Sequence, residues 1–179
     1  MTLGIWNEES DVRPYEEGDI AIHDGELLIC TGELEISMAL KWKYACRDIG
    51  MIFGIPWQLL DAVIAEESGG DPAVVSKAGA IGLMQIIPKY HPECSENLYN
   101  PYNNIHCGAA ILKSYNPSGD WKDESAVLCA LASYCWGPGN VGKKPRYDQW
   151  PQEVQQYCDN IWKLYQAKLE GSNDDQSGD

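Results

Sequence analysis

Two adjacent glutamates, Glu66 and Glu67, end a segment (56–68) whose apolar residues recur with a helical period. At about 100° per residue, Glu67 falls near the middle of the apolar face, one turn beyond Val63 and Ile64, whereas Glu66 falls at its edge. Burial disfavours a charged carboxylate and raises its pKa, which suits a general acid that works near neutral pH. The pattern makes Glu67 a candidate general acid. A helix end at which Glu67 simply reaches water is the alternative.

The residues after Glu67 follow a specific order. Glu67 is followed directly by Ser68, then by Ser76 nine positions after the glutamate, and then by the segment 79–88, Gly-Ala-Ile-Gly-Leu-Met-Gln-Ile-Ile-Pro. This order resembles the signature of the soluble lytic transglycosylases, which has Glu-Ser, a later Ser and a Gly-Leu-Met-Gln segment. Gln85 lies eighteen positions after Glu67, as in that family.

The resemblance continues beyond this signature and spans about residues 50–165. It includes Asn104-Ile105, Gly108, Leu112, Tyr134, Gly137-Pro-Gly139-Asn-Val141, Glu153 and Tyr157. The chain also departs from the family at three places. Cys135 stands where the family has Asn, Ile87 replaces a Met, and Val154-Gln155 replaces a Thr-Arg pair. These departures bear on substrate contacts more than on the reaction, because Glu67 and Gln85 are present.

The resemblance implies a set of substrate-binding residues around Glu67. Gln85 has an amide donor and acceptor suited to sugar hydroxyl and acetamido groups, and a serine hydroxyl serves in the same way. The glycines of 79–82 would let the backbone approach a sugar closely. Glu153 resembles a second acidic, substrate-binding position, although a helix dipole would also favour it. The implied binding residues are Ser76, Met84, Gln85, Tyr134, Glu153 and Tyr157.

The family's reaction needs one carboxylate where most glycosidases use two. The resemblance implies cleavage of the β-1,4 bond between N-acetylmuramic acid and N-acetylglucosamine, with Glu67 as general acid and then general base and a 1,6-anhydromuramyl product. No cofactor and no metal are expected. A second hypothesis is a muramidase like goose-type lysozyme, for which Asp61 and Asp71 are weak candidates as the second carboxylate. A third is an inactive peptidoglycan-binding or structural module, which Cys135 leaves open.

Cysteine content indicates an oxidising destination, because seven cysteines are many for a reduced cytosolic protein. His91, Cys94, His106 and Cys107 are four potential zinc ligands, but their spacing is poor for a tetrahedral site. A disulfide between Cys94 and Cys107 is the favoured interpretation. Cys135 and Cys158 lie in two motifs that should border one cleft, so they form a second candidate pair. Connectivity cannot be read from sequence alone.

Periodicity predicts a mainly α (α+β) protein, and the resemblance implies a lysozyme-like helical domain. Asp24-Gly25 within the alternating residues 19–30 predicts a β-hairpin. We expect a helix from Ser37 to about Phe53 that stops at Gly54, and a second helix with Pro56 in its first turn. Further helices are expected near 78–87, 103–115, 123–135 and 151–168. The expected parts are an N-terminal extension (1–35), a transglycosylase domain (36–168) and a disordered tail (169–179).

Charge restricts the partners. Thirteen basic and 27 acidic residues give a formal net charge of −14 at pH 7, which repels nucleic acid and anionic membranes. No apolar run approaches the roughly eighteen residues of a membrane span, so membrane insertion is not expected. The expected partner is the peptidoglycan glycan strand, bound by a monomer.

Location is inferred from the start of the sequence, which has no basic, apolar secretory signal. Peptidoglycan lies outside the cytoplasmic membrane, so the protein is expected to act in the periplasm, cell wall or extracellular space. A bacteriophage protein, as a virion component or an endolysin, and a specialised export route are both consistent with this. The N-terminal hairpin is expected to cap the helical core, with docking to a virion or secretion partner as the alternative.

Overall fold

The computed structural model describes residues 20–23, 26–29, 42–94 and 97–174, and the chain divides into two units, 1–37 and 38–179. In the first unit, β1 (Ile20–His23) pairs antiparallel with β2 (Glu26–Ile29), with Ile20 opposite Ile29. This confirms the predicted hairpin. Asp24-Gly25, the predicted turn, lies outside the described residues.

The second unit begins with two helices joined by a short turn. α2 (Lys43–Phe53) ends at Gly54, whose left-handed backbone (φ 64°) matches the predicted stop. The predicted start at Ser37 lies outside the described residues, and Trp42 caps the helix as it is observed. α3 (Trp57–Ser68) starts one residue later than expected, because Pro56 occupies the N-cap with ψ 127°.

The predicted helix near 78–87 is wrong. This segment folds into a turn-rich loop with two isolated antiparallel bridges, Val75 to Ile81 and Ile81 to Ile86. Gly79, Gly82 and Gln85 have φ values of 84°, 76° and 49°. A right-handed helix needs negative φ at every residue, so these three residues exclude it.

Four helices and a 3-10 turn complete the unit. α4 (Pro101–Tyr115), α5 (Glu124–Trp136) and α7 (Gln152–Asp174) confirm the other predicted helices, and Asn100 and Asp123 cap α4 and α5 with their side chains. α6 (Pro138–Lys143) and the 3-10 turn η1 (Tyr147–Gln149) were not expected. α7 also runs to Asp174, into the segment predicted to be a disordered tail, whose residues 175–179 lie outside the described chain.

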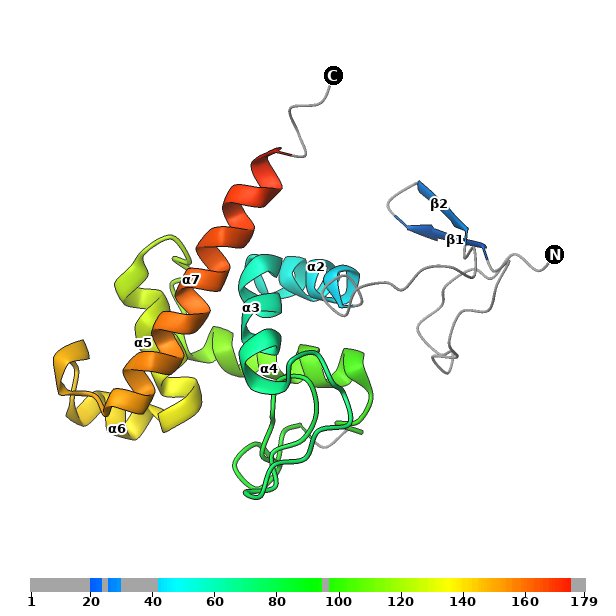
Figure 1. Ribbon diagram of the computed structural model, residues 1–179. Helices are drawn as coiled ribbons and strands as arrows, with labels where there is room; N and C mark the ends of the chain where they lie inside the picture. The colour runs from blue at the N-terminus through cyan, green and yellow to red at the C-terminus, as the bar shows by residue number, and fades with distance from the viewer. Residues whose placement is uncertain (1–19, 24–25, 30–41, 95–96, 175–179) are drawn as a thin grey trace. The chain divides into compact units, whose positions relative to one another are not determined.

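The helices pack around α3 (Figure 1). α3 packs against α2 and against the long α7, which also packs on α5, while α4 contacts both α2 and α5. Six consecutive residues of α3, 59–64, are buried, as expected for a central helix with neighbours on several sides. Among them, Asp61 forms an ion pair with Lys168 of α7 at 2.6 Å. This pair and the apolar contacts hold α3 and α7 together.

Within the described residues, no helix is long and apolar enough to cross a membrane. The buried apolar residues of the second unit form one core that extends from Cys46 to Tyr165.

Candidate active site

Glu67 lies in the last turn of α3 and faces α7. The hydroxyl of Tyr157 donates a hydrogen bond of 2.5 Å to Glu67 Oε1. Burial raises the pKa of Glu67 to about 7; the hydrogen bond from Tyr157 opposes this rise and the charge of Glu66 adds to it. A carboxyl group with such a pKa is populated in both protonation states near neutral pH, as an acid and base catalyst requires.

Glu66 has different surroundings from Glu67. Its Oε1 accepts a hydrogen bond of 3.1 Å from Asn160 Nδ2, one turn beyond Tyr157 on α7. Two α7 side chains thus hold the two neighbouring carboxyl groups separately. This arrangement agrees with the helical-wheel distinction, which puts Glu67 rather than Glu66 on the core-facing side.

Two tyrosines complete the surroundings of Glu67. Tyr134 OH donates to the backbone carbonyl of Met84 at 2.8 Å and so joins α5 to the loop after α3. Burial, followed by the negative charge of Glu67, raises the pKa of both Tyr134 and Tyr157 well above its ordinary value. Both phenols therefore keep their protons and remain hydrogen-bond donors at neutral pH.

Ser76 and Gln85 brace the loop that follows α3. Ser76 Oγ accepts a hydrogen bond from the backbone N–H of Ala80 at 3.0 Å. Gln85 Nε2 donates to the carbonyls of Gly82 at 2.9 Å and Val74 at 3.2 Å. Because the amide nitrogen of Gln85 is engaged within the loop, its carboxamide oxygen is the atom suited to a ligand hydroxyl.

Met84 does not line the site as the resemblance implied. Its side chain is completely buried, and it packs so closely on Gly108 of α4 that a Cβ at position 108 would overlap the Met84 sulfur. The contribution of Met84 to the site is its carbonyl, which receives the Tyr134 hydroxyl.

Gly82 also has a different role from the predicted one. Its backbone has φ 76°, and a Cβ there would overlap the Asn104 side chain and lie 2.8 Å from the Leu98 carbonyl. Its lack of a side chain therefore makes room for a protein group. Gly79, by contrast, has open space around the position of a Cβ, so close approach to a sugar remains an expectation for Gly79 alone.

Asn104 is an organising residue for which the sequence suggested no role. It is completely buried on α4; its Oδ1 accepts from Met84 N–H at 2.8 Å and its Nδ2 donates to the carbonyls of Ile81 and Leu98, each at 2.9 Å. Two signals were available. The family resemblance includes Asn104, and Asn is a poor helix former that nevertheless stands inside the predicted helix 103–115.

Glu153 lies in the first turn of α7, one turn before Tyr157, and its side chain is exposed. Among the hydrogen bonds found for the described residues, none joins Glu153 to another predicted site residue. The structure thus brings Glu67, Tyr134 and Tyr157 together, places Gln85 near them through the loop, and leaves Glu153 at the surface.

An open pocket of about 540 Å³ adjoins this group. Its wall includes two predicted residues, Gln85 and Tyr134. The other lining residues come from the end of α5 and the start of α6 (Ser133, Cys135, Trp136, Gly137 and Pro138), from the loop after α3 (Ile86, Ile87, Tyr90 and His91) and from α4 (Ile111 and Tyr115). Aromatic rings beside polar groups suit the apolar faces and hydroxyl edges of sugars.

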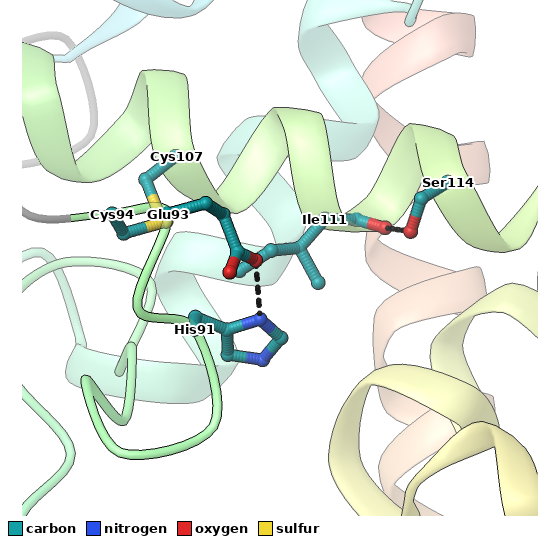
Figure 2. Close-up of polar contacts among 6 residues, drawn as sticks. All are labelled: His91, Glu93, Cys94, Cys107, Ile111 and Ser114. Carbon is teal, nitrogen blue, oxygen red and sulfur yellow. Dashed lines mark hydrogen bonds and ion pairs between the residues drawn. A yellow bond between two sulfur atoms is a disulfide. The ribbon is translucent and has the colours of Figure 1, made fainter.

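The predicted disulfide between Cys94 and Cys107 is present, with a Cα–Cα distance of 5.9 Å. Figure 2 shows it joining the loop that carries His91 and Glu93 to α4. His91 Nδ1 lies 3.1 Å from Glu93 Oε1, so the loop has its own polar contact. The disulfide fixes one wall of the pocket relative to the helical core. Within the described residues, no group of three His, Cys, Asp or Glu side chains is arranged to hold a metal ion.

The candidates for a second carboxylate have other structural roles. Asp61 is buried and paired with Lys168 at 2.6 Å. Asp71 is exposed and accepts a hydrogen bond from the Ala73 N–H at 2.9 Å, which is a local turn contact. Neither carboxylate is placed with Glu67 and Tyr157.

The chain is similar to known proteins in sequence and in fold. Residues 46–156 match the family model of the transglycosylase SLT domain. A stretch of 123 residues is 38% identical to the endo-type membrane-bound lytic murein transglycosylase A of Klebsiella pneumoniae and 36% identical to the protein of that name in Salmonella enteritidis. Each alignment covers 60% of this chain and 60% of the relative, so the chain spans about 60% of the length of these relatives.

A solved structure shares the fold. The X-ray structure of an inactive mutant of the lytic transglycosylase Slt from Pseudomonas aeruginosa superposes with a TM-score of 0.60, at 24% identity, over 76% of this chain and 26% of that one. The mainly helical, lysozyme-like fold implied by the sequence is thereby confirmed. With its Glu67 motif and a family match over more than half of its length, the chain belongs to the transglycosylase SLT domain family.

Proposed function

We propose that this protein is a peptidoglycan lytic transglycosylase that cleaves the β-1,4 bond between N-acetylmuramic acid and N-acetylglucosamine. The observation that carries the proposal is the Glu67 carboxyl group, whose pKa is raised by burial to about 7 and which accepts a hydrogen bond from Tyr157. The names of the relatives, lytic murein transglycosylases, support the same reaction.

In the first step, protonated Glu67 gives its proton to the glycosidic oxygen. The bond from that oxygen to the anomeric carbon breaks, N-acetylglucosamine leaves as an alcohol, and positive charge develops on the muramyl ring. The Glu67 carboxylate that remains is negatively charged, and the Tyr157 hydroxyl stabilises it by donating a hydrogen bond.

In the second step, the Glu67 carboxylate removes the proton from the 6-hydroxyl of the muramyl residue. The 6-oxygen bonds to the anomeric carbon and closes a 1,6-anhydro ring. Glu67 is protonated again, so the cycle consumes no water and needs no second carboxylate. We propose that Gln85, Tyr134 and the pocket wall beside them bind the glycan, and that Ser76 acts indirectly by shaping the loop.

A muramidase would require a base that positions water, and the ion-paired Asp61 and the turn-forming Asp71 are both unsuited to that role. An inactive module would have no need for a half-buried glutamate with a dedicated tyrosine donor. We therefore favour the transglycosylase, acting where peptidoglycan lies, outside the cytoplasmic membrane.

Mass spectrometry of muropeptides released from purified peptidoglycan tests this proposal. Products with 1,6-anhydromuramyl ends are expected, and they are lighter by one water molecule than the hydrolytic products. Reducing muramyl ends would instead show a muramidase, and the absence of released fragments from several types of wall would show a binding module.

A further inference from the structure

Two thiols lie beside the active site on facing helices. Cys135, in the last turn of α5, is exposed and lines the pocket. Cys158, on α7, is completely buried and directly follows Tyr157 in the chain. Both are free in the structure. An accessible thiol, Cys135, thus lies near a buried one, Cys158. Cys135 is also the residue that replaces the asparagine typical of the family.

The sulfur atoms of the two residues are anchored close together. Cys158 Sγ donates across the helix interface to the carbonyl of Leu128 on α5, and Cys135 Sγ donates to the carbonyl of Ala132, each at 3.7 Å. Leu128 and Ala132 are one turn apart on the same helix, so their carbonyls place both sulfurs on one face of α5. The neighbouring Cys135, together with burial, raises the pKa of the Cys158 thiol.

This thiol pair is adjacent to the groups that control Glu67. The phenol of Tyr157 donates a hydrogen bond to Glu67. Because Tyr157 and Cys158 are consecutive on α7, a displacement of Cys158 is transmitted to the tyrosine through one peptide unit.

We propose that Cys135 and Cys158 form a thiol–disulfide exchange site whose oxidation lowers the activity of the enzyme. The oxidant is a small-molecule disulfide. The Cys135 thiolate attacks one sulfur of that disulfide, forms a mixed disulfide and releases one small thiol. The Cys158 sulfur then attacks Cys135 Sγ, and the Cys158 proton passes to the departing sulfur, which leaves as the second small thiol. The small disulfide gains two electrons and the protein thiols lose two, so the exchange is balanced and reversible.

The expected effect on activity follows from geometry. A disulfide brings its sulfurs to about 2.05 Å, well inside hydrogen-bond distance. Cys158 Sγ must therefore leave the Leu128 carbonyl and move towards Cys135, and the turn of α7 that contains Tyr157 shifts relative to Glu67. Loss of a hydrogen bond to a charged group corresponds to about a tenfold or greater loss of rate.

The test is treatment of the purified whole chain with oxidised glutathione, followed by peptide mapping and measurement of anhydromuropeptide release. We expect a peptide that links Cys135 to Cys158, an unchanged Cys94–Cys107 disulfide, and a roughly tenfold drop in activity that a monothiol reductant reverses. The effect is expressed for each protein as the ratio of its treated to its untreated activity.

Three variants sharpen the test. Cys129→Ser removes a neighbouring thiol on α5 and should respond like the wild type. Cys158→Ser should retain a glutathione adduct on Cys135, and Cys135→Ser should show neither a link nor a change in its activity ratio. Failure to find the Cys135–Cys158 link, a link without loss of activity, or a full response in Cys135→Ser would each refute the proposal.

The inference about activity rests on the proposed function, but different results would refute the thiol exchange site and the proposed function. Untreated wild-type protein without activity on peptidoglycan would count against the proposed function. The mapped Cys135–Cys158 link would still decide, independently of activity, whether the exchange site exists.

Discussion

Glu66 and Glu67 are adjacent in sequence, yet different side chains of α7 form hydrogen bonds with them. Tyr157 donates to Glu67 and Asn160 donates to Glu66. Glu67 combines burial, a raised pKa and a phenolic donor. Their chemical equivalence makes these two residues a matched pair for testing which one performs the proton transfers.

The substitution Glu67→Gln should lower anhydromuropeptide release by roughly a hundredfold to ten-thousandfold, because the amide cannot supply or remove the proton. Glu66→Gln should keep activity within a few-fold of wild type. Turnover of purified peptidoglycan measures both. Comparable losses in the two variants would contradict the assignment of Glu67.

Folding of the Glu67→Gln variant can be checked by thermal unfolding. The folded-state pKa of about 7 lies above the ordinary value of 4.5, so the carboxyl group binds more protons in the folded than in the unfolded state between these values. Its contribution to stability therefore falls as pH rises through this window. At pH 8 the neutral variant should be at least as stable as the wild type, which separates loss of chemistry from loss of fold.

The pH dependence of activity provides a second residue-scale prediction. The first step needs protonated Glu67, so the rate should fall as pH rises above about 7. Tyr157→Phe removes a hydrogen bond that lowers the pKa of Glu67. It should move the falling limb of the pH–rate profile to higher pH and reduce the rate about tenfold. Glu66→Gln removes a charge that raises the pKa, and should move the limb to lower pH.

Profiles of kcat/KM against pH, recorded for the wild type and both variants, measure these shifts. If the falling limb moves in the same direction in both variants, or in neither, the group that titrates in the profile is not Glu67.

At the scale of elements, the site depends on the hydrogen bonds that hold the loop after α3 at residues 81–84. Ser68 Oγ donates to the Leu83 carbonyl at 2.8 Å, and Asn104 of α4 bonds the loop at Ile81 and Met84. Tyr134 of α5 attaches to the same loop at the Met84 carbonyl. Helices α3, α4 and α5 thus hold one loop in place, although that loop has little regular secondary structure of its own.

Gly108→Ala should disturb this fastening, because the added Cβ would overlap the buried Met84 side chain. Overpacking of a closed core typically costs about 1–3 kcal/mol, and displacement of Met84 also moves the carbonyl that receives Tyr134. Denaturant unfolding and peptidoglycan turnover should both show the loss.

Gly171→Ala is the matched control for Gly108→Ala. Gly171 is also helical, but nothing lies within 4 Å of the position of its Cβ, so alanine there should stabilise the protein by up to about 1 kcal/mol. Equal effects at both positions would mean that packing on Met84 is unimportant.

At the scale of the whole molecule, charge is unevenly distributed along the chain. Residues 1–37 contain ten of the 27 acidic residues and one of the 13 basic residues. The described helical unit has a continuous apolar core from Cys46 to Tyr165. The core and the group around Glu67 both lie within the unit that begins at Met38.

A chain that starts at Met38 should therefore fold and remain active. Its unfolding temperature should lie within a few degrees of that of the full chain, and its turnover of peptidoglycan within about twofold. Thermal unfolding by circular dichroism and muropeptide analysis measure these quantities. A large loss of stability would show that the N-terminal unit caps the helical core, which is the role expected from the sequence.

Helical periodicity placed Glu67 near the middle of the apolar face of its helix, although it left open whether the side chain reaches water, and it predicted α2, α3, α4, α5 and most of α7. Motif spacing indicated the family and drew attention to Ser76 and Gln85. These inferences succeed because helix period and motif order are local properties, which the chain carries without reference to its distant parts.

Contacts between distant segments were decided only by the tertiary structure. Tyr157 reaches Glu67 across 90 positions of sequence, and no local pattern specifies such a contact. The same applies to Met84. The motif predicted that Met84 contacts substrate, whereas in the folded protein its side chain is buried against Gly108. The expected helix at 78–87 fails because Gly79, Gly82 and Gln85 have positive φ. Asn104 of α4 bonds the neighbouring Ile81 and Met84, a tertiary effect that the local pattern does not contain. The proximity of Cys135 to Cys158 likewise results from the packing of α5 on α7, since the sequence left their pairing open.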